Sequence, residues 1–243
     1  MAQRPADPPA KPLSLKIASY NIRKAVGLDW VRNPLRILNV LGEIDADIVV
    51  LQEADRRFGR RTSALPPVMI GNHTDYRPVP LDVQTDSMGW HGNAILVREG
   101  IEIAHHDILH VPCLEPRGVV TARLMIEGRP LAVFGMHLDL SGLWRARQAR
   151  AIADLAEEAL SQMPTVMMGD LNEWRSNAGV FREFSRHFTV LDCGRSFPAR
   201  RPVGSLDRIM HCGGVEVEDY GVHQSALASQ ASDHLPVWAR IRI

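Results

Sequence analysis

The sequence predicts an α/β fold of the α+β type, in which two β-sheets pack face to face and helices cover their outer sides. Strand-like and helical stretches mix without the strict alternation of a doubly wound parallel sheet. The turn Glu127-Gly128-Arg129 also joins two strand-like runs as a hairpin. We expect a flexible N-terminal segment, rich in proline and alanine, over residues 1–12 and a single domain over residues 13–243.

The first third of the chain predicts a strand, a helix and a second strand. Residues 14–22 alternate as a strand, and the Asn33-Pro34 dipeptide opens a helix because proline is tolerated in the first helical turn. One face of this helix is apolar and consists of Leu35, Leu38, Leu41 and Ile44. A buried strand follows at 47–51. Residues 55–90 carry many turn formers, so we expect a long connection of the kind that is usually functional.

The rest of the chain predicts six strands and two helices. The strands are expected at 94–97, 119–126, 131–136, 165–168, 206–210 and 235–242. The clearest helix spans 145–163, and the other spans 178–187. The apolar stripe of the clearest helix consists of Ala149, Ile152, Ala153, Ala156, Ala159 and Leu160.

Composition excludes several classes of protein. No apolar run approaches the roughly 20 residues that span a bilayer, and the N-terminus lacks the apolar core of a signal peptide, so we expect a soluble, cytoplasmic protein. Cys113, Cys193 and Cys212 form neither a disulfide framework nor a zinc motif. A formal net charge of zero provides no bulk attraction to nucleic acid, although arginines cluster locally.

Polar clusters lie beside six of the strand-like runs. They are Ser19-Tyr20-Asn21, Gln52-Glu53, His137, Gly169-Asp170-Leu171-Asn172, Ser205-Leu206-Asp207 and Ser232-Asp233-His234-Leu235-Pro236. Together they resemble the divalent-metal phosphoesterases of the endonuclease/exonuclease/phosphatase superfamily over nearly the whole chain. The Gly-Asp-Leu-Asn and Ser-Asp-His-Leu-Pro segments are the specific ones, because they must also occur in this order. The resemblance implies a four-layered sandwich of the DNase I type with its active site at one rim.

Hydrolysis of a phosphate ester requires neutralised oxygens and an oriented water, which a divalent metal and a few fixed side chains provide. Glu53 is the best single metal ligand, because a carboxylate that follows a buried strand is costly to bury without a cation. By resemblance, Asn21 and Asp233 join it, and hard oxygen ligands suit Mg²⁺ or Mn²⁺. The alternative for Glu53 is an exposed turn.

The resemblance assigns catalytic roles to His137, Asp170, Asn172, Asp207 and His234. Asp170 and Asn172 alternate along an extended segment, so both can face one side, where the carboxylate would orient or deprotonate the attacking water and the amide would contact a phosphate oxygen. Either Asp170 or His234 takes the water proton, and the residue types do not choose between them. Asp207 is expected to orient the His234 ring. Arg117 is expected to clamp the phosphate and Asn93 to contact it, with ordinary turn roles as the alternative.

Three departures, Arg23, Asp55 and His137, argue against the abasic-site repair branch of the superfamily. The segments Glu-Pro-Arg-Gly and Gly-Asp-Leu-Asn-Glu-Trp are most similar to those of small bacterial members related to DNase I and to neutral sphingomyelinases. We therefore expect a metal-dependent phosphodiesterase that acts on nucleic acid or a phospholipid, with no protein partner. The alternatives are a phosphomonoesterase for a sugar or inositol phosphate and a non-catalytic binding module. A serine hydrolase is disfavoured because no Gly-X-Ser-X-Gly elbow occurs.

Overall fold

Two six-stranded sheets form the centre of the computed structural model, which describes residues 12–56, 62–81, 86–160, 163–177 and 179–243. Across the first sheet the order is β11 (Glu216–Val222), β12 (Val237–Arg242), β1 (Ser14–Asn21), β2 (Ile48–Gln52), β4 (Ala94–Arg98) and β3 (Tyr76–Pro78). Across the second it is β5 (Glu102–Leu109), β6 (Val119–Ile126), β7 (Arg129–His137), β8 (Thr165–Asp170), β10 (Asp207–Cys212) and β9 (Thr189–Leu191).

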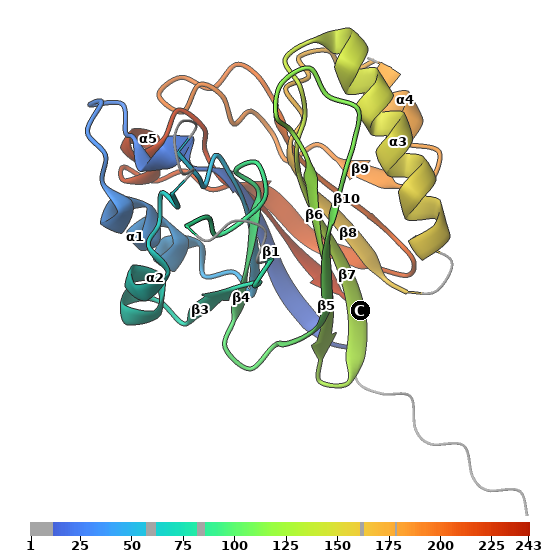
Figure 1. Ribbon diagram of the computed structural model, residues 1–243, viewed down its shortest axis with the longest axis horizontal. Coiled ribbons are helices and arrows are strands. Elements are labelled where there is room, and N and C mark those ends of the chain that lie inside the picture. Colours follow the sequence, from blue (N-terminus) through green and yellow to red (C-terminus); the bar gives the residue numbers. More distant parts are fainter. Residues whose placement is uncertain (1–11, 57–61, 82–85, 161–162, 178) are drawn as a thin grey trace, which may run out of the picture.

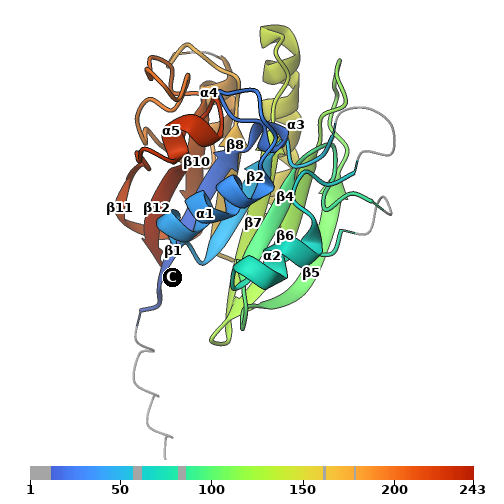
Figure 2. The ribbon, with the colours of Figure 1, turned by 90° about the vertical axis from the view of Figure 1, so that its left-hand side faces the viewer.

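Helices cover the outer face of each sheet and complete four layers. The first sheet carries α1 (Pro34–Ile44), α2 (Pro67–His73) and α5 (Ala228–Ala231), which face the viewer in Figure 2. The second carries α3 (Gly142–Leu160) and α4 (Gly179–Phe184) on the opposite side of the molecule (Figure 1). The predicted fold class, a sandwich of two sheets between helices, is confirmed.

The core between the two sheets is apolar and closely packed. It contains side chains of β1, β2, β4 and β12 from one sheet and of β6, β7, β8 and β10 from the other. The sheets approach closely at Gly135 of β7, where an added Cβ would lie 2.7 Å from a methyl of Val50 in the facing sheet and 3.0 Å from a methyl of Val120 in the neighbouring strand. Since packed interiors have few voids, the residues at this point fix the spacing of the layers.

Most predicted elements are present, with three kinds of correction. In α1, Asn33 caps the N-terminus by accepting the Arg36 N–H, but Leu35 is 40% exposed, so the buried face includes Ile37 and Val40 instead. The expected connection over 55–90 contains α2 and β3. The sequence also missed β5, β9, β11 and α5, of which β5, β9 and β11 are edge strands.

Some expectations fall partly outside the described residues. The N-terminal segment 1–12 lies there except for residue 12, as do residue 178 and the side chains of Ala159 and Leu160. Among the helices that the structure describes, none combines the length and apolarity needed to cross a bilayer.

Strand directions bring the polar clusters to one edge of the sandwich. β1 runs parallel to β2 and antiparallel to β12. In the second sheet, β8 runs parallel to β7 and antiparallel to β10. Across the second sheet, Asp170 is the direct partner of both His137 and Asp207. The β6–β7 turn and the C-terminus lie at the other end of the molecule (Figure 1).

Candidate active site

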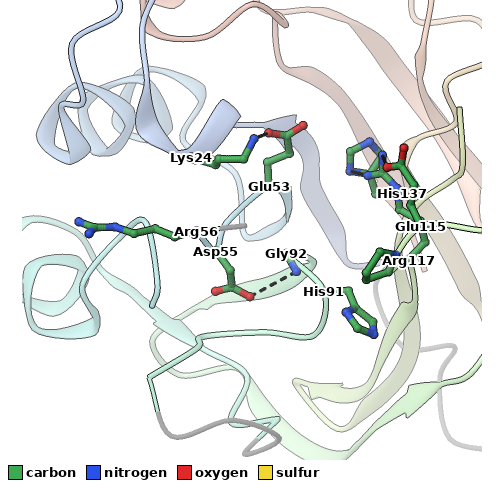
Figure 3. A pocket seen from close by; sticks show the side chains of 10 residues that line it. Lys24, Glu53, Asp55, Arg56, His91, Gly92, Glu115, Arg117 and His137 are labelled. Carbon is green, nitrogen blue, oxygen red and sulfur yellow. Dashed lines mark hydrogen bonds and ion pairs between the residues drawn. The ribbon is translucent and has the colours of Figure 1, made fainter. Parts of the chain in front are cut away.

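A pocket of about 370 Å³ opens at this edge between the loops of the two sheets. Its lining residues are Lys24, Glu53, Asp55, Arg56, His91, Gly92, Glu115, Pro116, Arg117 and His137. Figure 3 shows Lys24 and Glu53 on one side of it and His137, Glu115 and Arg117 on the other. The pocket is therefore lined by charged groups of both signs.

Asp170 is the centre of a buried polar cluster behind this pocket. Its Oδ2 accepts the Asn21 amide at 3.0 Å and lies 3.4 Å from Nε2 of His137 and 3.7 Å from Nε2 of His234. Its Oδ1 accepts the backbone N–H of Asn172 at 2.9 Å. Burial raises the pKa of Asp170 to about 6, against the opposing effect of His234. One carboxylate thus faces both candidate histidines.

His234 is held between two carboxylates. Its Nδ1 lies 2.9 Å from Oδ2 of Asp207, which also accepts the hydroxyl of Ser196. Burial alone would lower the imidazole pKa, but Asp207 and Asp170 outweigh it and raise the pKa to about 10. Since both ring nitrogens face acceptors, His234 is an imidazolium in this arrangement.

His137 differs from His234 in its protonation and in its partners. Arg117 Nη1 lies 2.7 Å from Nδ1 of His137, and Arg117 Nη2 pairs with Glu115 at 3.1 Å. A guanidinium carries only donors, so Nδ1 must accept and the imidazole proton is on Nε2. His137 is therefore neutral and presents an N–H toward Asp170. The two histidines differ in charge because their partners differ.

The three expected metal ligands all contact one short segment, the 3₁₀ turn η1 (Arg23–Ala25). Asn21 Oδ1 accepts the Arg23 N–H, Glu53 pairs with the Lys24 ammonium, and Asp233 pairs with the Arg23 guanidinium at 3.4 Å. The Glu53 and Asp233 side chains are 27% and 32% exposed. Two partly accessible carboxylates and an amide oxygen are hard donors, so this set fits a divalent metal such as Mg²⁺.

A second group with metal-ligand atoms is less suitable. Asp170, Asp207 and His234 bring one such atom each within 4.8 Å of one another. These residues are buried, Asp207 Oδ2 already pairs with the His234 ring at 2.9 Å, and an imidazolium has no lone pair for a metal. The proton on His234 takes the place of a cation there. The Glu53 side of the cluster is the better metal site.

Glu53, Arg117 and His137 are the predicted residues that line the pocket. Two others, Asn93 and Asn172, use their amides to bind backbone carbonyls instead. Asn93 is fully buried and its amide donates to the Gly118 carbonyl, so it ties its own loop to the one that carries Arg117. Asn172 does not continue the strand: its φ is 50°, and its amide donates to the Leu138 carbonyl. The expected extended segment ends at Asp170 because this left-handed residue turns the chain.

The sequence missed several residues that complete the site. Lys24 and Glu115 pair with predicted residues, and Ser196 supports Asp207 from a loop without any motif. Asp139 accepts the backbone N–H groups of Leu114 and Glu115 and so holds the Arg117 loop. For Asp139 the sequence does carry a signal: the apolar Leu138 separates it from His137, and this alternation predicts that His137 and Asp139 point to the same side.

Backbone conformation at this edge is unusual. Six non-glycine residues with positive φ are part of the site or its loops, namely Arg23, Lys24, Ala25, Glu53, His91 and Asn172. Such conformations cost of order 1–3 kcal/mol each and gather at functional sites in proteins. Strain of this kind is consistent with an edge shaped for binding rather than for stability alone.

A model of the Endonuclease/Exonuclease/phosphatase family matches residues 18–234, which include all ten of the predicted site residues. The chain belongs to this family. The uncharacterized protein YbhP of Escherichia coli (strain K12) is 30% identical, with 95% of this chain and 97% of YbhP covered. A mannosyl-6-phosphatase of Bacteroides thetaiotaomicron, Bt3783, has a TM-score of 0.73 at 19% identity, covering 93% of this chain and 99% of its own.

A further solved structure has the same fold and a nucleic acid bound. D. rerio TDP2 complexed with a single-strand DNA product has a TM-score of 0.71 at 18% identity, covering 94% of this chain and 98% of its own. Family membership makes the chain a phosphoric ester hydrolase, in a family whose enzymes generally depend on a divalent metal. The substrates of these relatives differ, so the fold does not select one.

Proposed function

We propose that the protein is a divalent-metal-dependent phosphodiesterase. The observation that carries this proposal is that four cations of the site face carboxylates: Arg117 with Glu115, Lys24 with Glu53, Arg23 with Asp233, and His234 with Asp207. A site whose cations are largely compensated suits a diester, with one negative charge, better than a monoester dianion. Magnesium or manganese adds positive charge to either complex equally.

The proposed roles follow from which atoms face the reacting phosphate. Glu53, Asp233 and Asn21 hold the metal, which neutralises phosphate oxygens and lowers the pKa of water when it is bound. The Nε2–H of His137 donates a hydrogen bond to a phosphate oxygen while Arg117 fixes the tautomer of the ring. Because His234 already faces two carboxylates, Asp170 is the better acceptor for the water proton. Asn172 and Asn93 orient the loops on either side.

The test is hydrolysis of bis-p-nitrophenyl phosphate and p-nitrophenyl phosphate with Mg²⁺ or Mn²⁺, with and without chelator, for the native protein and His234→Ala. We expect diester cleavage that chelator abolishes and that the substitution lowers by about 10²- to 10⁴-fold. Diester cleavage unaffected by chelator and by the substitution would contradict the assigned site.

A phosphomonoesterase for a sugar phosphate is the second candidate, because the structurally similar Bt3783 is a mannosyl-6-phosphatase. A closed pocket of about 370 Å³ has room for one small ring. Cleavage of the monoester alone in the assay above would favour this function. We also propose that residues 13–243 form one domain, since β1 and β12, from the two ends of the chain, pair in one sheet.

A further inference from the structure

Trp174 is an exposed aromatic residue linked to His234 through one other ring. It follows β8 by four residues, and its side chain is 59% exposed. The Phe197 ring meets the indole edge to face at 5.8 Å and also packs 4.7 Å from the His234 imidazole. One aromatic contact therefore separates this exposed indole from a residue of the active site.

The Trp174 indole packs against Gly204, at a position where only glycine fits. An added Cβ at Gly204 would lie 2.8 Å from a carbon of the Trp174 ring, so any side chain there would push the indole away. Gly204 is itself fixed by backbone hydrogen bonds to Phe197 in both directions. Trp174 is thus exposed, but its ring is held in place by Phe197 and Gly204.

Trp174 also differs from the other tryptophans in what covers its ring. Arg23 lies over Trp30 at 4.4 Å, Arg147 over Trp144 at 4.9 Å, and Lys16 over Trp238 at 5.0 Å. Trp90 packs against two histidines. Among the described residues, Trp174 is the exposed tryptophan without a cation over its ring, which leaves that face open for a ligand.

The loops that form this support are rich in exposed arginine. The arginines are Arg175, Arg195, Arg200 and Arg201, and none has an acidic partner within ion-pair distance in the part of the chain that the structure describes. An open aromatic face on loops that also carry exposed guanidinium groups matches single-stranded nucleic acid, whose bases stack and whose phosphates attract cations. A phospholipid surface would instead favour the exposed leucines elsewhere, Leu114 and Leu140 of other loops and Leu143 at the start of α3.

We propose that Trp174 stacks on a nucleobase of a single-stranded substrate on the His234 side of the scissile phosphate, while the arginines of its loops contact the neighbouring phosphates. This inference rests on the proposed phosphodiesterase function. It makes Trp174 a determinant of substrate specificity, because the stacked base adds affinity without taking part in the bond cleavage.

The test compares cleavage of a single-stranded oligothymidylate with cleavage of a strand of equal length whose central residues lack bases. Native protein, Trp174→Ala, Trp174→Phe and the matched control Tyr220→Ala, an exposed aromatic of β11, are assayed with Mg²⁺ or Mn²⁺. We expect Trp174→Ala to raise KM for the base-bearing strand about ten- to hundredfold with little change in kcat, and Trp174→Phe to restore most of the affinity. On the strand without bases, all four proteins should be alike.

An equal effect of Trp174→Ala on both strands would overturn the inference, because it would indicate a purely structural role. Cleavage of phosphatidylcholine vesicles with no cleavage of either strand would also overturn it in favour of a lipid substrate. If the native protein cleaves no diester at all, including bis-p-nitrophenyl phosphate, the proposed function itself fails. Thermal unfolding of each variant checks that it is folded.

Discussion

Replacing Asp207 by Asn should destabilise the protein far more than an equivalent change at the surface. Asp207 is fully buried and accepts from both His234 and Ser196. Asparagine keeps the shape but removes the charge, so it weakens a hydrogen bond to a charged group, worth roughly 1.5–3 kcal/mol, and a neutral one, worth roughly 0.5–1.5 kcal/mol. The sum is about 2–4.5 kcal/mol, which corresponds to a Tm lower by about 5–15 °C for a protein of this size.

The assay is thermal unfolding in chelator, followed by circular dichroism, for native protein, Asp207→Asn, Ser196→Ala and Glu218→Gln. Glu218 is the matched control, because it also accepts from one cation and one hydroxyl, Arg242 and Ser14, but at an exposed site. We expect Glu218→Gln to lower Tm least, because solvent screens an exposed ion pair, and Ser196→Ala to fall between the two. If Asp207→Asn lowers Tm no more than Glu218→Gln, the buried pair does not stabilise the fold as argued.

Three further predictions test the metal site, the phosphate clamp and the core. Glu53→Gln should abolish the rise in Tm that Mg²⁺ or Mn²⁺ gives the native protein, as measured by thermal unfolding. An unchanged rise in Tm would show that the metal binds at another site. Arg117→Lys should lower kcat by about tenfold or more in the diester assay, because lysine cannot contact Glu115 and His137 with one planar fork; native activity would refute that role. Gly135→Ala should cost about 1–3 kcal/mol in chemical denaturation because its methyl meets Val50; a neutral result would show that the sheets can separate there.

Strands that are buried on both faces could be predicted from the sequence, whereas edge strands could not. β2 and β8 are fully buried, and their apolar runs have no competing interpretation. β5 carries charged residues or histidine at four of its eight positions and β11 carries acidic residues at three of its seven, so neither gives a continuous apolar run or a clean alternation. Each is recognisable as a strand only through its pairing with the next strand along the chain, β5 with β6 and β11 with β12.

The identity of most site residues could also be predicted, because strand ends deliver them to one edge whatever the details of the loops. The functions of the two asparagines depend on loop geometry instead. Asn93 turns inward to the Gly118 carbonyl, and Asn172 adopts a left-handed conformation. Neither a hydrogen bond between two loops nor a single positive φ leaves a periodic signal in the sequence.

The division of labour between the two histidines shows why pairing needs the structure. Arg117 is 20 residues from His137, and Asp207 is 27 residues from His234. The first pair forms when β6 and β7 pair, and the second forms only when the two sheets pack, because β10 and β12 belong to different sheets. The same residue type then becomes neutral beside a guanidinium and cationic beside carboxylates. Asp170 lies between a neutral N–H and an imidazolium, and this asymmetry favours it as the base. Exchange of the two partner sets would reverse the charges without changing the residue composition of the site.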